Sequence, residues 1–446
     1  MKKKAVDPRN LKITDMRFVD IDGAPKRCTL LKIFTNQGLV GYGEVRDASS
    51  KTYALMLKSR ILGENPCDVD RIFHKIKQFG GHSRQGGGVS GIEIALWDLA
   101  GKAYGVPLYQ MLGGRFRDSI RVYCDTDVEG RHSGRDMGLA LKKRMDMGFT
   151  FLKMDLGIGL LMDEPGTINA PLGLVQDMKK YAPHILNVQG GSVTADMVRH
   201  QKSYAIVHTA HPFTGIHLTE KGLNYLENYV REVREVIGYE VPLAVDHFGH
   251  VALEDCIRFA RRMEPYNLAW IEDMAPWQLT DHYVRLRSST TIPVCTGEDI
   301  YLKEGFEHLI KAGGVSVIHP DILTCGGALE LKKIADIADE NGVAVAVHMA
   351  ESPVACMAAV HVAAAMHNVL AIEYHSVDVP WWKDMVHGLP DPLIRDGFIQ
   401  VPDGPVLGIE SLNEDLLREH INPDIPGMWE DTSAWDREFS NDRIWS

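Results

Sequence analysis

The chain has 446 residues, of which 45% are hydrophobic and 24% carry charge, a composition typical of a folded globular protein. It excludes a disordered, a collagenous and a coiled-coil chain. The 48 basic and 60 acidic residues give a net charge of −12, and no dense stripe of Lys and Arg interrupts the acidic background, so we expect no nucleic acid partner. The length predicts two domains, one small and one larger.

The ends and the cysteines indicate where such a chain works. The first ten residues include Lys2, Lys3 and Lys4, but no apolar segment follows them, so we expect neither a secretory signal nor a membrane anchor. The 7 cysteines include no C-x-x-C pair, which favours reduced thiols over a disulfide framework or a zinc ribbon. The sequence therefore predicts a cytoplasmic protein without a membrane partner.

The opening part, residues 1–117, predicts an α+β domain. Strands are expected at 11–21, 27–34 and 39–45, and amphipathic helices at 68–79 and 91–105. A glycine-rich stretch at 82–88 precedes the second helix, where it forms either a flexible loop or a cradle for an anion. No Gly-Lys-Ser/Thr follows it, which excludes a phosphate-binding P-loop.

From residue 118 the pattern changes to short apolar runs, each followed by a helical pattern. These runs lie at 120–124, 150–155, 241–246, 268–272, 292–296, 315–319, 343–348 and 369–373. Eight strands alternating with helices predict a (β/α) TIM-type barrel over 118–385, with a doubly wound open sheet as the alternative. The long interval after Asp155 predicts an insertion at about 157–217, which is a lid, an oligomer contact or a plain surface excursion.

Polar residues end six successive strands at intervals of 23 to 27 residues. They are Asp246, Glu272, Glu298, Asp321, His348 and Glu373. The carboxyl ends of barrel strands converge on one mouth, so we expect these side chains to meet there. Crowded carboxylates raise each other's pKa unless a cation lies among them. Asp246, Glu272 and Glu298 are hard oxygen ligands, which favours Mg²⁺.

Further motifs accompany these strand ends. They are Gly-Tyr-Gly-Glu at 41–44, Ala-Leu-Trp-Asp-Leu-Ala-Gly-Lys at 95–102, Pro107 and Leu-Gly-Gly at 112–114. Together they resemble the enolase superfamily, in its mandelate racemase branch, along nearly the whole chain. The resemblance implies a modified barrel under the α+β capping (lid) domain, which the C-terminal segment 386–446 completes. It also implies one Mg²⁺ per active site, held by Asp246, Glu272 and Glu298, and an even-numbered homo-oligomer.

The same resemblance implies a catalytic dyad of Asp321 and His348, and a Glu373 that hydrogen-bonds the enediolate. Chemistry agrees, because an imidazole oriented through its other ring nitrogen titrates near neutral pH and can accept or donate a proton. Proton abstraction next to a carboxylate also needs cationic charge at the developing oxygens, and the resemblance implies that Mg²⁺ supplies it.

The second strand departs from the family pattern. The branch usually carries Lys-x-Lys there, whereas this chain reads Lys153-Met154-Asp155. Lys153 and Asp155 face the same way on a strand, so Lys153 is expected to bind the substrate carboxylate or to share in proton transfer, with Asp155 beside it as a substrate contact. The missing second lysine disfavours racemisation by two bases.

One-base chemistry fits this pattern better. We therefore expect a lyase that dehydrates an aldonic or related sugar acid to a 2-keto-3-deoxy acid. His250 and His375 are further expected substrate contacts, and His247 follows the third-strand ligand in the wrong register. Epimerisation or cycloisomerisation of a hydroxy acid through the same enediolate remains an alternative, as does a metal-binding scaffold without turnover.

Overall fold

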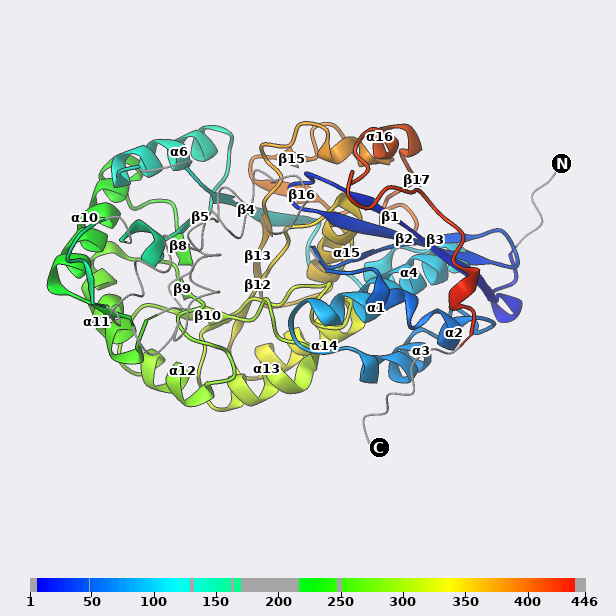
Figure 1. Ribbon diagram of the computed structural model, residues 1–446, viewed down its shortest axis with the longest axis horizontal. Helices are drawn as coiled ribbons and strands as arrows, with labels where there is room; N and C mark the ends of the chain where they lie inside the picture. The colour runs from blue at the N-terminus through cyan, green and yellow to red at the C-terminus, as the bar shows by residue number, and fades with distance from the viewer. Residues whose placement is uncertain are drawn as a thin grey trace. The chain divides into compact units, whose positions relative to one another are not determined.

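The computed structural model describes residues 6–47, 49–128, 132–161, 164–169, 216–246 and 251–437 (Figure 1). They fall into two compact units. Unit 1 comprises residues 1–122, 297–307 and 319–446, and unit 2 comprises residues 123–296 and 308–318. None of the helices among the described residues is long and apolar enough to cross a lipid bilayer.

The fold class is α/β with a closed parallel barrel, as the sequence predicts. The hydrogen-bonded strand order is β13-β12-β11-β10-β9-β8-β5-β4, and β13 also pairs with β4. The strands are β4 (Ser119–Thr126), β5 (Leu152–Asp155), β8 (Leu243–Asp246), β9 (Ile271–Glu272), β10 (Val294–Thr296), β11 (Val317–Ile318), β12 (Ala344–Val347) and β13 (Val369–Tyr374). Each of them overlaps one of the eight expected apolar runs, so the barrel prediction is confirmed.

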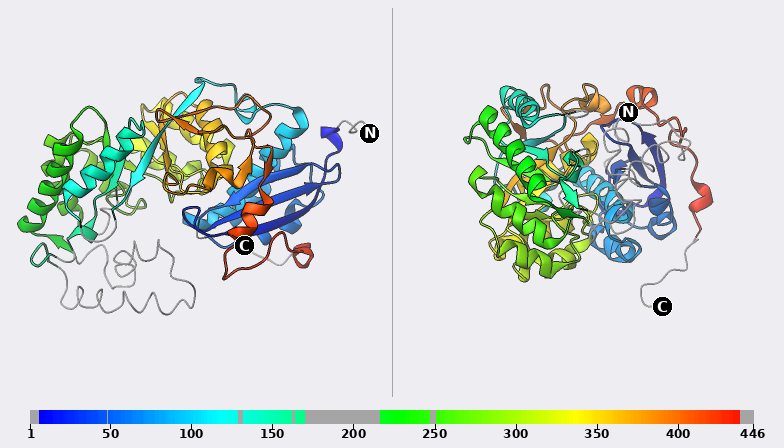
Figure 2. Two further views of the ribbon diagram at one scale, coloured as in Figure 1. Left: turned by 90° about the horizontal axis from the view of Figure 1, so that it is seen from above. Right: turned by 60° about the vertical axis from the view of Figure 1, so that its left-hand side comes forward.

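Unit 1 contains an antiparallel sheet of β1 (Ile13–Ile21), β2 (Cys28–Thr35) and β3 (Val40–Val45), with α4 (Gly86–Tyr104) packed against it (Figure 2). The contact is close, because a Cβ on Gly43 would lie 2.1 Å from the Gly91 carbonyl oxygen. The C-terminal segment returns to the sheet edge, where Met428 bridges Val19. The smaller helices of this part are α1 (Thr52–Leu55), α2 (Lys58–Ile61), α3 (Val69–Ile76) and α5 (Leu108–Met111).

The glycine-rich stretch at 82–88 differs from the expected flexible loop. Gly86, Gly87 and Gly88 form the buried first turn of α4, which begins at Gly86 rather than at residue 91. A Cβ on Gly87 would lie 2.5 Å from the Arg46 Cβ. Glycine is therefore used here for close packing against the end of β3, and the prediction of a loop was wrong.

Two buried glutamates of unit 1 cap helices that flank its barrel strands. Glu93 accepts hydrogen bonds from the backbone amides of Ala328 (2.7 Å) and Leu329 (3.1 Å), at the start of α14 (Ala328–Glu340). Glu44 accepts hydrogen bonds from the amide (3.0 Å) and hydroxyl of Ser352, at the start of α15 (Pro353–Ala364). Both carboxyl groups satisfy amides that have no partner within their helix.

The C-terminal part of unit 1 consists of short elements. They are β14 (Val386–His387), β15 (Ile394–Arg395), β16 (Phe398–Gln400), β17 (Ser411–Leu412) and α16 (Glu414–Glu419). β16 pairs antiparallel with the first half of β4, where Ile399 lies opposite Ile120. Trp382 is fully buried, donates a hydrogen bond to the Glu351 carbonyl oxygen and packs edge-on against Tyr374. These tryptophan contacts are structural packing.

In unit 2 parallel strands alternate with helices. The helices are α6 (Gly134–Asp146), α10 (Glu220–Ile237), α11 (Leu253–Met263) and α12 (Thr280–Arg287), and α13 (Leu302–Lys311) ends in this unit. α10 begins after Thr219, whose hydroxyl accepts a hydrogen bond from the Gly222 amide. The strands β6 (Ile168–Asn169) and β7 (His217–Leu218) pair antiparallel at the two ends of the insertion, most of which lies outside the described residues.

Candidate active site

The first cluster of polar side chains lies in unit 2, at the ends of β5, β8 and β9. The Lys153 ammonium lies 2.7 Å from Asp246 Oδ2 and 2.9 Å from Glu272 Oε1. The indole of Trp270 donates a hydrogen bond of 2.7 Å to the other oxygen of Glu272. All three charged groups are buried. The cluster therefore holds two of the predicted metal ligands and the predicted lysine together.

Asp273 was missed by the sequence reasoning and extends this cluster. One carboxylate oxygen each from Asp246, Glu272 and Asp273 lies within 4.8 Å of the others. Asp273 has a φ of 47°, in the left-handed region, and accepts a hydrogen bond of 2.6 Å from the Thr296 hydroxyl. Only its position directly after Glu272 could have marked it. Asp155 lies opposite Asp246 in the register of β5 and β8.

The second cluster lies in unit 1 and contains the expected dyad. His348 Nδ1 lies 2.6 Å from Asp321 Oδ2, and the two residues form a backbone bridge at the ends of their strands. Asp321 Oδ1 accepts hydrogen bonds from the amides of Leu323 (2.6 Å) and Thr324 (2.9 Å). These amides fix the carboxylate, and the carboxylate orients the imidazole. His348 Nε2 lies 3.2 Å from Glu298 Oε2.

The dyad is buried, and its surroundings determine its charge. Burial lowers the pKa of His348 to about 4, and nearby Arg46 acts in the same direction, against the raising effect of Glu298. The imidazole is therefore neutral at pH 7 and can accept a proton. Burial raises the pKa of Asp321, while Arg46 opposes that rise.

Arg46 and Glu351 complete this cluster, and sequence reasoning assigned a role to neither. The Arg46 guanidinium is buried and lies 2.7 Å from Asp47, 2.9 Å from Asp321 and 2.5 Å from Glu351. Burial and the neighbouring Asp321 raise the pKa of Glu351 to about 8. One cation thus serves three buried acids. The only signals available were their positions. Arg46 directly follows β3, and Glu351 lies three residues after His348.

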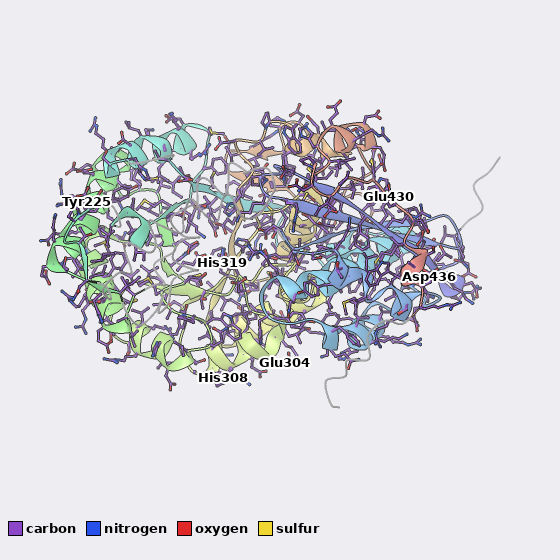
Figure 3. All side chains as sticks on the ribbon, viewed as in Figure 1. Tyr225, Glu304, His308, His319, Glu430 and Asp436 are labelled. Carbon is purple, nitrogen blue, oxygen red and sulfur yellow. The ribbon has the colours of Figure 1, made fainter. Side chains whose placement is uncertain are left out.

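Glu373 lies among three histidines in unit 1. Its Oε2 lies 2.8 Å from His319 Nε2 and 3.9 Å from His348 Nε2, and its Oε1 lies 3.2 Å from His375 Nε2. The structure therefore brings together Glu373 and the expected substrate contact His375. His319, which follows β11 (Figure 3), was assigned no role from the sequence. Its alternation with Asp321 along the chain was the available signal.

Two of the histidines considered from the sequence lie elsewhere. His247 and His250 fall outside the described residues. The prediction of His250 as a substrate contact therefore remains a prediction.

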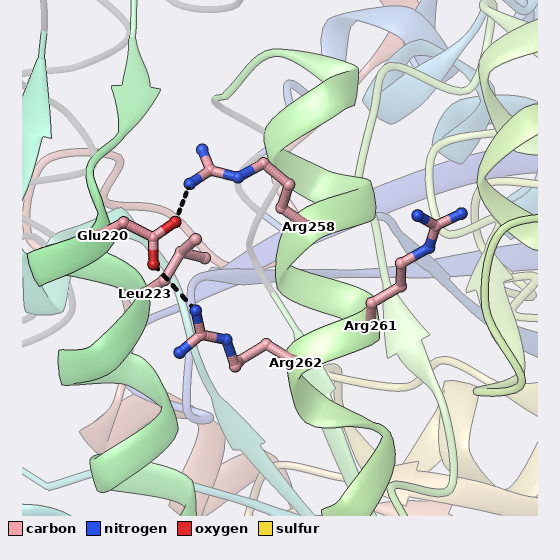
Figure 4. A pocket seen from close by; sticks show the side chains of 5 residues that line it. All are labelled: Glu220, Leu223, Arg258, Arg261 and Arg262. Atoms are coloured by element: carbon pink, nitrogen blue, oxygen red, sulfur yellow. Dashed lines mark hydrogen bonds and ion pairs between the residues drawn. The ribbon is translucent and has the colours of Figure 1, made fainter.

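An open pocket of about 320 Å³ lies between α10 and α11 of unit 2, and none of its lining residues belongs to the clusters above (Figure 4). Its lining residues are Glu220, Leu223, Arg258, Arg261 and Arg262. One carboxylate oxygen of Glu220 lies 2.5 Å from an Arg258 nitrogen, and the other lies 2.9 Å from an Arg262 nitrogen. The pair of arginines thereby ties the two helices together, and we assign this cavity no catalytic role.

Comparison with known proteins places the chain in a family. A model of the mandelate racemase / muconate lactonizing enzyme N-terminal domain matches residues 22–113, and a model of the enolase C-terminal domain-like family matches residues 198–416. A D-xylonate dehydratase from Haloferax volcanii is 32% identical over 422 residues, covering 93% of this chain and 90% of that protein. The chain belongs to the enolase superfamily, in its mandelate racemase and muconate lactonizing enzyme branch.

Other relatives of this enolase-superfamily member agree. A D-galactonate dehydratase from Pectobacterium atrosepticum is 26% identical, covering 89% of this chain and 91% of that protein. The crystal structure of a mandelate racemase/muconate lactonizing enzyme-like protein from Rubrobacter xylanophilus matches with a TM-score of 0.76 and 28% identity, covering 94% of this chain and 99% of that one. Members of the superfamily use a divalent metal ion, and Asp246, Glu272 and Asp273 are candidate ligands here.

Proposed function

We propose that this chain is a Mg²⁺-dependent sugar-acid dehydratase. It removes the proton next to the carboxylate of an aldonic or related acid, expels the β-hydroxyl as water and yields a 2-keto-3-deoxy acid. The observation that carries the proposal is the buried Asp321–His348 dyad, with a neutral imidazole, in a chain related along its length to D-xylonate and D-galactonate dehydratases.

The donor set of unit 2 fits Mg²⁺. The oxygens of Asp246 and Glu272 are buried carboxylate atoms close enough to share one ion, and no thiol or imidazole belongs to that group of ligand atoms among the described residues. Asp246 and Glu272 would hold the ion, and the family resemblance adds Glu298 as the third ligand. When bound, Mg²⁺ supplies positive charge to the carboxylate oxygens that become more negative as the α-proton leaves.

His348 is the proposed base. Asp321 accepts a hydrogen bond from Nδ1–H, so the lone pair of the neutral ring is on Nε2. Nε2 takes the α-proton, the C–H electron pair forms the C=C bond, and the C–O bond to the β-hydroxyl breaks. The imidazolium returns the proton to the departing hydroxyl, which leaves as water, and the resulting enol becomes the 2-keto acid.

Lys153 is the proposed contact for the substrate carboxylate. Its ammonium is buried beside Asp246 and Glu272, the two proposed metal ligands of unit 2, so an anionic group bound to the ion is within its reach. A charge-assisted contact of this kind orients the acid end of the substrate. Asp155 and His375 are proposed to contact the hydroxyl groups of the sugar chain. We further propose that the chain acts as a homo-oligomer, on a small-molecule substrate.

The test is a screen of sugar acids, including D-xylonate and D-galactonate, with Mg²⁺ present and release of a 2-keto acid as the readout. Dehydration yields one keto acid for each substrate consumed. Reactions in D₂O distinguish dehydration from the alternative, epimerisation. Recovered substrate that carries deuterium, with no keto acid formed, would favour epimerisation over elimination. If no acid in the library gave either deuterium exchange or a keto acid, both dehydration and epimerisation would be contradicted.

A further inference from the structure

His319 is a fully buried histidine whose two ring nitrogens both have close polar neighbours in unit 1. Nδ1 lies 2.9 Å from the Ala346 carbonyl oxygen, and Nε2 lies 2.8 Å from Glu373 Oε2. Both His319 and Glu373 have an exposed fraction of 0%. Bulk water therefore does not screen these two contacts, and their hydrogen atoms must come from the groups themselves or from protein neighbours.

The number of hydrogen-bond donors determines how many protons the pair of His319 and Glu373 holds. A carbonyl oxygen only accepts, so the hydrogen of the Ala346 contact is on His319 Nδ1. If the ring is neutral, Nε2 is bare, and Glu373 must carry the hydrogen as a carboxylic acid. If Nε2 also carries a hydrogen, the ring is a cation and Glu373 is a carboxylate. Both arrangements place one proton on the Nε2···Oε2 contact and give the pair a net charge of zero.

The remaining arrangement is a neutral ring facing an ionised Glu373. It would bring two lone pairs to 2.8 Å with no hydrogen between them, on groups that are both fully buried. A buried acceptor without a donor is costly, and more so when it is charged. This arrangement is therefore disfavoured strongly enough that Glu373 does not exist there as a free carboxylate.

We propose that His319 is a positioning residue that keeps one proton on its contact with Glu373, so that the pair is electrically neutral. The pair of His319 and Glu373 then adds no net charge beside the dyad. Its second oxygen, Oε1, lies 3.2 Å from His375 Nε2. From the sequence, Glu373 was expected to be one of five crowded carboxylates, whereas in the structure it is paired with the imidazole of His319.

The pairing also bears on the proposed reaction, and this step rests on the proposed function. Glu373 Oε2 lies 2.8 Å from His319 Nε2 but 3.9 Å from His348 Nε2, and the two rings meet edge-on with centroids 5.4 Å apart. Two imidazoles thus compete for one oxygen. By holding that oxygen, His319 keeps Glu373 from pairing with His348 Nε2, whose nearer carboxylate neighbour is Glu298 at 3.2 Å. Without His319, an ionised Glu373 would pair with His348.

The direct test locates the protons in the unmodified, Mg²⁺-supplemented full chain. Neutron diffraction shows which of the atoms Nδ1, Nε2 and Oε2 carry hydrogen. NMR of ¹⁵N-labelled histidine and ¹³C-labelled glutamate reports the same at several pH values. The charged and titratable groups facing the pair are His348 and His375, and Glu298 lies beyond His348. A single proton on the contact, as acid with neutral ring or as imidazolium with carboxylate, supports the proposal. A neutral ring with an ionised Glu373 overturns it.

A matched pair of variants tests the positioning role. H319Q reaches the Nε2 position with an amide that can donate to Glu373, whereas H319N reaches only the Nδ1 position. We expect H319N to lower kcat about 10-fold to 100-fold, the range for lost supporting contacts, with little change in KM, and H319Q to recover most of that loss. H367Q, on an exposed histidine paired with Asp339, is the control and should behave as the unmodified chain.

The outcomes separate the two proposals. Equal losses of kcat in H319N and H319Q would show that the Nε2 contact is not what matters, and would overturn the positioning role. If the unmodified chain turns over no sugar acid, the proposed function fails, but the neutron and NMR measurements still decide where the proton lies.

Discussion

The sharpest consequence of the dyad geometry concerns D321N. Oδ1 of Asp321 accepts from the backbone amides of Leu323 and Thr324, which can only donate, so we expect the oxygen of the introduced amide at that position, with loss of the Arg46 contact at Oδ2. Its NH₂ group then takes the place of Oδ2, which lies 2.6 Å from His348 Nδ1 and 2.9 Å from an Arg46 nitrogen. A donor now faces Nδ1, so the ring must accept there and carry its hydrogen on Nε2. The proposed base is converted into the wrong tautomer.

The expected loss is large because Nε2 can no longer accept the α-proton. Tautomer reversal in a comparable carboxylate–imidazole pair costs about 10⁴-fold in kcat, or about 5 kcal/mol of activation free energy. We therefore expect D321N to slow both keto-acid release and exchange of the α-proton with D₂O by about 10³-fold to 10⁴-fold. Mg²⁺ binding should be preserved, since Asp246 and Glu272 are untouched.

The control for D321N is D339N. Asp339 lies 3.0 Å from His367 in the same kind of pair, but both side chains are exposed. It should leave turnover unchanged. If a folded D321N retained α-proton exchange within about 10-fold of the unmodified chain, the tautomer argument would be refuted. Circular dichroism and thermal unfolding of both variants establish that they are folded.

Three further predictions follow from the other clusters. K153M removes the ammonium beside Asp246 and Glu272. We expect kcat/KM for a sugar acid to fall about 10-fold to 100-fold, because a hydrogen bond to a charged group is worth about 1.5–3 kcal/mol. An unchanged kcat/KM would show that Lys153 does not bind the substrate. Chelation by EDTA should abolish keto-acid release and added Mg²⁺ should restore it, while activity that survives dialysis against EDTA would contradict the metal proposal. Burial raises the pKa of Glu93 to about 7 from its ordinary 4.5, so the folded chain holds a proton that the unfolded chain releases in this window, and the free energy of unfolding falls as pH rises through it. E93Q lacks this titration. We therefore expect the free energy of unfolding of E93Q, measured in urea, to rise relative to that of the unmodified chain by about 3 kcal/mol between about pH 5 and pH 8. A difference that stays constant over this range would show that Glu93 does not titrate there.

The barrel and its strand ends were predictable because the regular spacing of short apolar runs indicates both the strands and the residues that end them. Buried parallel strands are short apolar runs, and the residue that ends each run must lie at the carboxyl edge of the sheet. This logic correctly placed Asp246, Glu272, Asp321 and His348 at the ends of their strands, from spacing alone. It also predicted helix α10, because its apolar residues recur with the helical period after a threonine cap.

What the sequence did not reveal depends on approach between segments that are distant in the chain. The glycines at 86–88 read as a loop by local propensity, but tertiary packing against Arg46 makes them a helix turn. Arg46 itself lies 275 positions before Asp321 in numbering, and no local pattern connects them. By the sequence pattern, His319 is the last residue of an apolar strand, and only the fold brings the Ala346 carbonyl and Glu373 to its ring.

Burial is the main reason that the pKa of His348 is low, and residues outside the barrel strands add to its effect. Glu44 is the second-last residue of β3, and Arg46 follows its last residue, Val45. The end of β3 therefore both caps α15 and places a guanidinium against Asp321 and Glu351. The positive charge of Arg46 opposes protonation of His348 while it stabilises the Asp321 carboxylate that orients the ring. In our proposal, His319 adds to this by keeping Glu373 from the same imidazole. A neutral, oriented His348 thus requires two supporting contacts, one cationic and one neutral, and strand-end spacing alone predicts neither.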